Sequence, residues 1–194
     1  MPESFEYVVA GLGALGSATC HELARRGHRV LGLERFTLGH DRGASHDSSR
    51  ILRHSYHTPG YVRLTLEAYD DWARFERDAG TELVTAAGGL DLFPPEPAIG
   101  VEDYLDSLDQ VGIGYELRTE PGDRRPRPRE RGRAGDACRP RAVPSAGGVY
   151  GRLGTFGRVL ADLAAEGTCG IDLTPYALDR PALTDPTYRT HWLV

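Results

Sequence analysis

Short apolar runs alternate with stretches of helical period along the first 119 residues of the chain. Residues 6–10 and 29–34 are apolar runs, and residues 14–26 between them have the composition of a helix. Gly27 suits the left-handed position at which helices often end. This pattern predicts a strand–helix–strand unit, which is the opening of a parallel sheet in an α/β fold.

Two further helices are predicted before residue 119. Thr58 and Pro59 suit the N-cap and first position of a helix that Gly80 would end. Its apolar residues recur at helical spacing, at Tyr61, Leu64, Ala68, Trp72 and Phe75. Residues 101–111 carry a second apolar stripe. Residues 83–93 are predicted to be extended, and alternation over residues 113–117 predicts a half-buried strand.

Residues 120–148 break this pattern, because they are rich in Arg and Pro and almost lack large apolar side chains. Such a segment buries too little surface to offset the entropy of ordering it. An anion-binding arm and a disordered linker are two interpretations. We favour a third, frame-shifted translation, because out-of-frame GC-rich DNA yields mainly Arg, Pro, Gly and Ala. The composition indicates a GC-rich coding sequence, because all 23 basic residues are Arg and none is Lys.

The pattern returns in residues 149–194, so the sequence divides into regions 1–119, 120–148 and 149–194. Thr155 is a predicted N-cap and Gly167 a predicted stop for a helix between them. The apolar stripe of this helix would consist of Phe156, Val159, Leu160, Leu163 and Ala164.

Charge and composition exclude several classes of function. The formal net charge of −5 argues against a nucleic-acid partner. No stretch approaches the roughly 20 apolar residues that cross a bilayer, and the first residues lack the positive charge of a secretory signal. Three cysteines provide no disulfide framework. We therefore expect a cytoplasmic protein without a membrane partner.

The strongest chemical signal is the loop Gly11-Leu12-Gly13-Ala14-Leu15-Gly16, which follows a predicted strand and opens a helix. The first glycine permits a tight turn, Gly13 lets a pyrophosphate approach the backbone, and Gly16 lets helix and strand pack closely. The free N–H groups at the helix start favour phosphate charge. Glu34, 18 residues beyond Gly16, is placed to accept hydrogen bonds from ribose hydroxyls and argues against NADP. The loop alone leaves FAD and NAD open.

Residues 5–118 resemble the N-terminal part of the monomeric sarcosine oxidase and N-methyltryptophan oxidase family, within the D-amino-acid-oxidase-like superfamily. The matching runs are the Gly11 loop, Leu33-Glu34-Arg35-Phe36, Gly43-Ala44-Ser45-His46, Ser49-Arg50-Ile51-Leu52-Arg53, Tyr61-Val62 and Gly88-Gly89-Leu90. The resemblance implies an FAD-binding Rossmann-like domain with an incomplete substrate domain. It also implies oxidation of the C–N bond of a small N-methyl amino acid, with O2 reduced to hydrogen peroxide.

The resemblance assigns roles to individual residues. Arg50 matches the arginine that lies against the flavin ring, where its charge favours the reduced, anionic flavin. Arg53 matches the arginine that pairs with the substrate carboxylate. Ser45, His46 and Ser49 match positions that line the flavin. Arg35 follows Glu34 in a matching run and is assigned with it to cofactor binding, as are Ala14 and Leu15 within the loop.

Residues 157–180 resemble the end of the same family, where the last helix points its N-terminus at the flavin. The segment that holds the active-site His and Lys residues and the flavin-linking Cys has no match. We therefore predict an internally truncated amine oxidase that is catalytically impaired. The alternatives are an NAD-dependent dehydrogenase and a non-catalytic, vestigial nucleotide-binding fragment.

Overall fold

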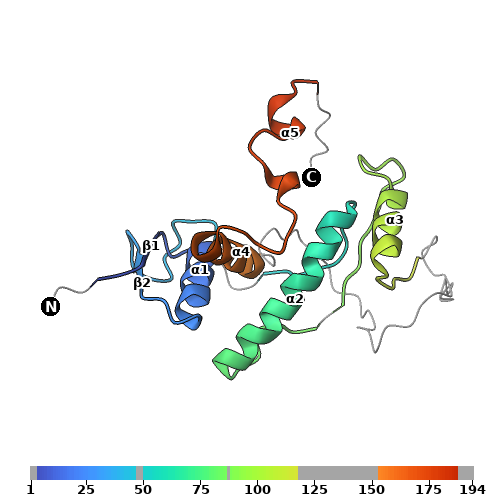
Figure 1. Ribbon diagram of the computed structural model, residues 1–194. Coiled ribbons are helices and arrows are strands. Elements are labelled where there is room, and N and C mark those ends of the chain that lie inside the picture. Colours follow the sequence, from blue (N-terminus) through green and yellow to red (C-terminus); the bar gives the residue numbers. More distant parts are fainter. Residues whose placement is uncertain (1–3, 47–49, 87, 118–152, 188–194) are drawn as a thin grey trace. The chain divides into compact units, whose positions relative to one another are not determined.

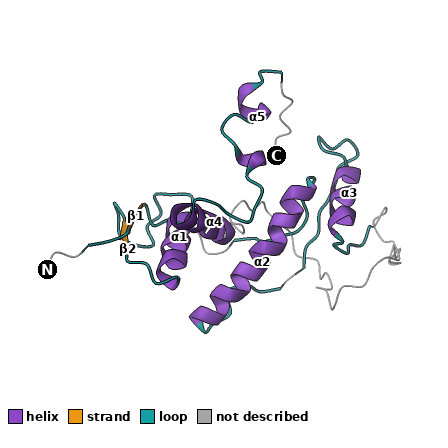
Figure 2. Cartoon of the chain, in the orientation of Figure 1, coloured by secondary structure: helices purple, strands orange, loops and turns teal. Residues whose placement is uncertain are grey.

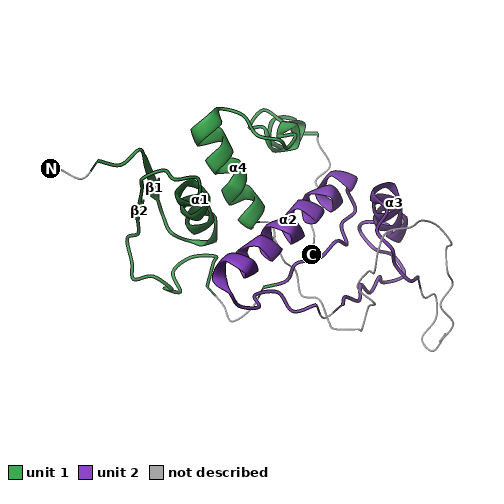
Figure 3. Cartoon of the chain, turned by 60° about the horizontal axis from the view of Figure 1, so that its bottom comes forward, with its two compact units in different colours: residues 1–50, 152–194 green, residues 51–151 purple. Residues whose placement is uncertain are grey.

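The computed structural model describes residues 4–46, 50–86, 88–117 and 153–187. The chain divides into two compact units, residues 1–50 with 152–194 and residues 51–151 (Figure 3). The predicted boundaries at residues 119 and 148 stay a prediction, because the Arg/Pro-rich segment lies outside the described residues.

The first unit is built on the predicted strand–helix–strand motif, which is confirmed (Figure 1). Strand β1 (Tyr7–Ala10) pairs in parallel with β2 (Val30–Leu33), in a register that joins Tyr7 to Val30. Helix α1 (Ala14–Arg25) connects them. In the described part of the chain the sheet has these two strands (Figure 2). Comparison with solved structures, given below, supports the predicted α/β class.

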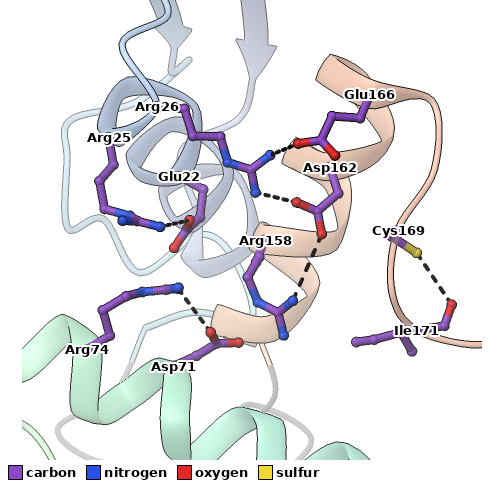
Figure 4. Close-up of polar contacts among 10 residues, drawn as sticks. All are labelled: Glu22, Arg25, Arg26, Asp71, Arg74, Arg158, Asp162, Glu166, Cys169 and Ile171. Carbon is purple, nitrogen blue, oxygen red and sulfur yellow. Dashed lines mark hydrogen bonds and ion pairs between the residues drawn. The ribbon is translucent and has the colours of Figure 1, made fainter.

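Helix α4 (Leu153–Glu166) belongs to the same unit and packs on α1. A Cβ atom added to Gly157 would lie 2.4 Å from Ala18 Cβ, so the two helix backbones meet closely there. Further along, Arg26 forms ion pairs with Asp162 and, at 3.4 Å, with Glu166 (Figure 4). The N-termini of α1 and α4 therefore lie at the same end of the pair.

One expectation for this helix, its N-cap, was wrong. It begins at Leu153, and Thr155 is fully buried inside it rather than capping it. The face that meets α1 contains the small residues Gly157 and Ala161, because only small side chains permit so close an approach. Leu160 and Leu163 of the predicted apolar stripe remain 41% and 36% exposed. With Leu15, Phe156, Val159, Leu173 and Tyr176 they line an apolar groove of about 230 Å³.

Two short helical segments follow α4. They are the 3-10 turn η2 (Thr174–Tyr176) and helix α5 (Pro181–Thr184). Tyr176 packs edge-on against Phe156, with ring centroids 5.4 Å apart. The segment after α4 is thereby attached to the first unit.

The second unit contains α2 (Pro59–Ala79) and α3 (Val101–Val111), with the bounds that the sequence predicts. Gly80 ends α2 in the left-handed conformation, with φ of 65°. A small core forms around Tyr56, Val62 and Leu108. Partly buried residues pack against this core: Tyr61, Val111, Ile113 and Tyr115.

The predicted extended segments form no regular strand within the described residues. Residues 83–86 and 88–93 are irregular apart from a single bridge residue, Leu90. Residues 113–117 keep the predicted alternation, since Ile113 and Tyr115 are half-buried and Gly114 and Glu116 exposed, but they pair with no strand. Among the described helices, none has the length and apolar character needed to cross a membrane.

Candidate functional site

The glycine loop between β1 and α1 has the geometry that its sequence predicts. Gly11 has φ of 94°, which disfavours any other residue there. A Cβ atom on Gly16 would lie 1.8 Å from the carbonyl oxygen of Gly11 and 3.4 Å from Val9 Cγ1. Because the first of these contacts is with backbone, Gly16 is required for the helix to start so close to the strand.

Three backbone donors of this loop are free to bind a ligand. The first intrahelical bond of α1 runs from Ser17 N to Gly13 O, at 2.9 Å. In the part of the chain that the structure describes, the N–H groups of Gly13, Leu15 and Gly16 have no acceptor. Converging N–H groups at the start of a 12-residue helix form a site for an anion such as a pyrophosphate.

Glu34 lies at the end of β2 and holds the glycine loop in place. Its carboxylate accepts hydrogen bonds from Leu12 N at 2.8 Å and from Phe36 N at 3.1 Å. These N–H groups hold the pKa of Glu34 below its ordinary value. His40 Nε2 lies 3.4 Å from the same carboxylate. The contact with Leu12 was not expected from the sequence, in which Glu34 has only the role of a ribose acceptor.

Ser45 contacts the loop from the segment after β2. Its Oγ accepts a hydrogen bond from Ala14 N at 2.9 Å and would lie 3.0 Å from a Cβ atom on Gly13. A serine hydroxyl therefore lies beside the loop, where it adds a polar group to the anion site. It also occupies the space that any side chain at position 13 would need.

His46 and Arg50 contact backbone carbonyl groups next to Ser45. His46 Nδ1 lies 2.6 Å from the carbonyl oxygen of Gly43. The Arg50 guanidinium donates to the carbonyl oxygens of Ala44, at 3.2 Å, and of His46. Arg50 is exposed. Ser49, the remaining residue assigned to this stretch, lies outside the described residues.

Arg35 belongs to an aromatic cluster that follows Glu34. Its guanidinium carbon lies 5.4 Å from the centroid of the Phe36 ring, and that of Arg42 lies 5.0 Å from it. The His40 ring packs edge-on against Phe36 at 4.9 Å. Two cations on one ring give the loop after β2 a local positive charge.

Arg53 lies in the second unit, in an aromatic environment. Its guanidinium carbon lies 5.2 Å from the centroid of the Tyr56 ring, and its Nη1 atom lies 3.4 Å from Asp91 Oδ1. The side chain of Arg53 is 20% exposed. Such a cation can bind a small carboxylate with two parallel hydrogen bonds.

The family model described as FAD dependent oxidoreductase matches residues 6–151, which is 146 of the 194 residues. The chain belongs to this family. The assignment confirms the predicted resemblance and favours FAD over NAD. The matched range includes the Arg/Pro-rich segment and stops before α4, so the resemblance of residues 157–180 to the end of the family stays a prediction.

Curated relatives of this chain within the FAD-dependent oxidoreductases include sarcosine oxidases. The monomeric sarcosine oxidase of Streptomyces avermitilis is 42% identical over 118 residues, covering 60% of this chain and 30% of that protein. The peroxisomal sarcosine oxidase of Mus musculus is 38% identical over 112 residues, covering 58% and 28%. This chain thus spans less than a third of the length of these relatives.

A solved structure gives the same result at the level of the fold. NikD, an unusual amino acid oxidase essential for nikkomycin biosynthesis, is 32% identical and aligns with a TM-score of 0.50. The alignment covers 59% of this chain and 30% of NikD. The chain therefore has the fold of part of an FAD-dependent oxidoreductase.

The first unit brings most of the predicted cofactor residues together around the glycine loop. Glu34 and Ser45 bond to loop N–H groups, and Arg35 lies next to Glu34 in the chain. Arg50 donates a hydrogen bond to the carbonyl oxygen of Ala44, next to Ser45. Arg53 belongs to the other unit.

Proposed function

We propose that this chain is the nucleotide-binding part of an FAD-dependent oxidase that acts on a small secondary amine, such as an N-methyl amino acid, with O2 as the electron acceptor. The observation that carries the proposal is the glycine loop with three free N–H donors, in a chain that the FAD-dependent oxidoreductase model matches over residues 6–151. The names of the sarcosine oxidase relatives support the substrate class.

The residues around the loop fit the phosphate and ribose of FAD. The free N–H groups of Gly13, Leu15 and Gly16 would bind the pyrophosphate, assisted by the dipole of α1. Glu34 keeps acceptor capacity, because a carboxylate has about four lone-pair sites and its bonds to the N–H groups of Leu12, Phe36 and Arg35 use at most three of them. It can therefore accept hydrogen bonds from ribose hydroxyls while it holds the loop.

Helix α4 adds a second favourable dipole. Because Gly157 lies beside Ala18 and Asp162 beside Arg26, α4 runs parallel to α1 and begins at the same end. The positive ends of both dipoles then act at the side of the unit where the loop lies. This arrangement supports the role that the resemblance gives to the last helix, which is to stabilise negative charge on the cofactor.

Bound FAD would supply the redox chemistry, in which it accepts a hydride equivalent from the carbon beside the amine nitrogen. The chain would supply charge and orientation. Arg50 would place a fixed positive charge beside the flavin ring, where Ser45, His46 and Ser49 would provide polar contacts. Arg53 would orient the substrate by binding its carboxylate.

We propose that this chain is catalytically impaired. It spans less than a third of its relatives, and the resemblance places the active-site His and Lys residues in a segment that has no match here. The free thiols Cys20 and Cys169 and the lack of a disulfide framework support a cytoplasmic location. The net charge of −5 supports a function without nucleic acid.

The flavin content of the purified chain tests the nucleotide site. We expect the visible absorbance of bound flavin, either on purification or after addition of FAD. Gly16→Ala should weaken FAD binding about tenfold or more, because the new Cβ atom cannot avoid the backbone of Gly11. Gly170→Ala is the matched control, since a Cβ atom there would meet nothing within 4 Å.

A wild-type chain that takes up no FAD, or a Gly16→Ala variant that binds it normally, would contradict the proposed cofactor site. A peroxide assay with sarcosine and with N-methyltryptophan tests the impairment separately. We expect little or no peroxide above the level of free FAD. Clear turnover of either amine would show that the truncated chain is a competent oxidase.

A further inference from the structure

We propose that Asp91 is an internal counter-ion for Arg53 that an incoming carboxylate must displace, so that Asp91 limits the affinity of the site for its substrate. This inference rests on the proposed role of Arg53 in substrate binding. It adds a residue that the sequence did not assign to the site, and it predicts that removal of a negative charge improves binding.

The contact between the two side chains is single and long. Arg53 Nη1 lies 3.4 Å from Asp91 Oδ1, whereas charge-assisted N–H···O bonds in proteins are usually about 2.7–2.9 Å. The side chains are 20% and 31% exposed, so water screens the attraction. A partly exposed pair with one long contact is weak, and a better ligand for the guanidinium can replace Asp91.

The guanidinium of Arg53 also has unused donors. It carries five N–H groups, and within the described residues its one hydrogen bond is to Asp91. The Nε atom is buried and has no partner there. A buried donor without an acceptor is costly, so the site favours a ligand that provides two acceptor atoms. A carboxylate provides two in the geometry that matches guanidinium.

The aromatic residues around the pair fix the cation and favour a small organic acid over an inorganic anion. Tyr56 is 4% exposed and its ring centroid lies 5.2 Å from the guanidinium carbon, a distance at which cation–π attraction holds the side chain. Burial raises the pKa of Tyr104. The positive charge of Arg53 lowers this pKa, and the negative charge of Asp91 raises it. The Phe93 ring packs edge-on against Tyr104 at 5.1 Å.

Asp91 lies on a segment that permits its displacement. Residues 88–93 have no regular secondary structure apart from the bridge at Leu90, and within the described residues Asp91 forms no other hydrogen bond or ion pair. Arg53, in contrast, is held by Tyr56 of the unit's core. When a carboxylate competes for the guanidinium, the aspartate is therefore the partner that moves away.

The experiment measures acetate binding to the full-length chain by ligand-observed NMR titration, with acetamide as the neutral probe of similar shape. Asp91→Asn should bind acetate about two- to fivefold more tightly than wild type, because it removes a weak competing ion pair. Asp106→Asn on the exposed side of α3 changes the net charge equally and should leave the affinity unchanged. Arg53→Lys should weaken acetate binding about tenfold, because lysine lacks the planar fork.

Acetate binding by Asp91→Asn where wild type binds none would also support the proposal. Equal affinities of Asp91→Asn and Asp106→Asn would overturn it, as would equal gains for acetamide or no acetate binding by any variant. Asp91→Ser is the second variant if Asp91→Asn loses its far-UV circular dichroism. Flavin uptake by the same samples reports separately on the proposed oxidase function, because acetate binding requires no flavin.

Discussion

Gly157 lies where α4 comes closest to α1, and alanine at this position tests that packing. The added Cβ atom would lie 2.4 Å from Ala18 Cβ, 2.8 Å from Ala18 C and 2.9 Å from Thr19 N. The last two atoms are backbone and the first is attached directly to it, so no side-chain rotation can relieve the contacts. The whole helix would have to move.

The size of the effect follows from these distances. Carbon atoms pack at about 3.5–4.0 Å, so α4 would have to retreat by roughly 1 Å, which forfeits up to about half of the dispersion energy across the contact. Overpacking costs about 1–3 kcal/mol, and contacts with backbone atoms place this one in the upper part of that range, at about 2–3 kcal/mol. Alanine regains about 1 kcal/mol of helix propensity over glycine. We therefore expect a net loss of about 1–2 kcal/mol in the free energy of unfolding.

Urea unfolding followed by far-UV circular dichroism measures this loss. Gly60→Ala in α2 is the control, because a Cβ atom there meets nothing within 4 Å, and it should leave stability equal or higher. Adding Ala18→Gly to Gly157→Ala should restore part of the loss, since it removes only the contact at 2.4 Å. A Gly157→Ala variant as stable as wild type would refute the close packing of α1 and α4.

Three further predictions follow. His54 Nδ1 lies 2.6 Å from Thr65 Oγ1, and burial lowers the pKa of His54. The unfolded chain then binds the proton more readily, so stability should fall as the pH drops below about 6.5, and His54→Gln should reduce this fall in pH-dependent unfolding. The pKa of Glu34 is also lowered by folding, so the ionised carboxylate stabilises the folded chain above pH 4.5. This stabilisation is lost as the pH falls through the folded pKa of Glu34. Glu34→Gln should flatten acid unfolding in that range, and an unchanged profile would contradict the role of Glu34. Sequencing the encoding DNA should reveal family sequence in another frame across residues 120–156, and its absence from all frames would reject the frame-shift hypothesis.

Local signals predicted the helices and the glycine loop well. The bounds of α2 follow from Pro59 and Gly80, whose backbone preferences act within a few residues and do not depend on the rest of the fold. The conformation of Gly11 and the tight contact at Gly16 follow from spacing alone, because a strand that turns directly into a helix leaves no room for side chains there.

Features that depend on distant partners could not be predicted. The predicted apolar stripe of α4 includes Leu160 and Leu163, but α4 approaches α1 through Gly157, which lies beside Ala18. Neither segment alone indicates this pairing. Within the described residues of 83–93 there is no regular strand, since pairing requires a neighbour that local sequence does not specify. Asp91 belongs to none of the sequence motifs, and its contact with Arg53 joins residues that are 38 positions apart.

The ion pairs of Arg26 with Asp162 and Glu166 join positions that are 136 and 140 residues apart in the sequence. The second unit is thus an insertion into the first, and its length affects the first unit only through the entropy of closing a loop. That entropy grows with the logarithm of loop length, so tripling the insertion costs about 1 kcal/mol. A nucleotide-binding unit closed in this way can carry insertions of very different sizes. Evolution can therefore lengthen, shorten or replace the inserted segment without rebuilding the first unit.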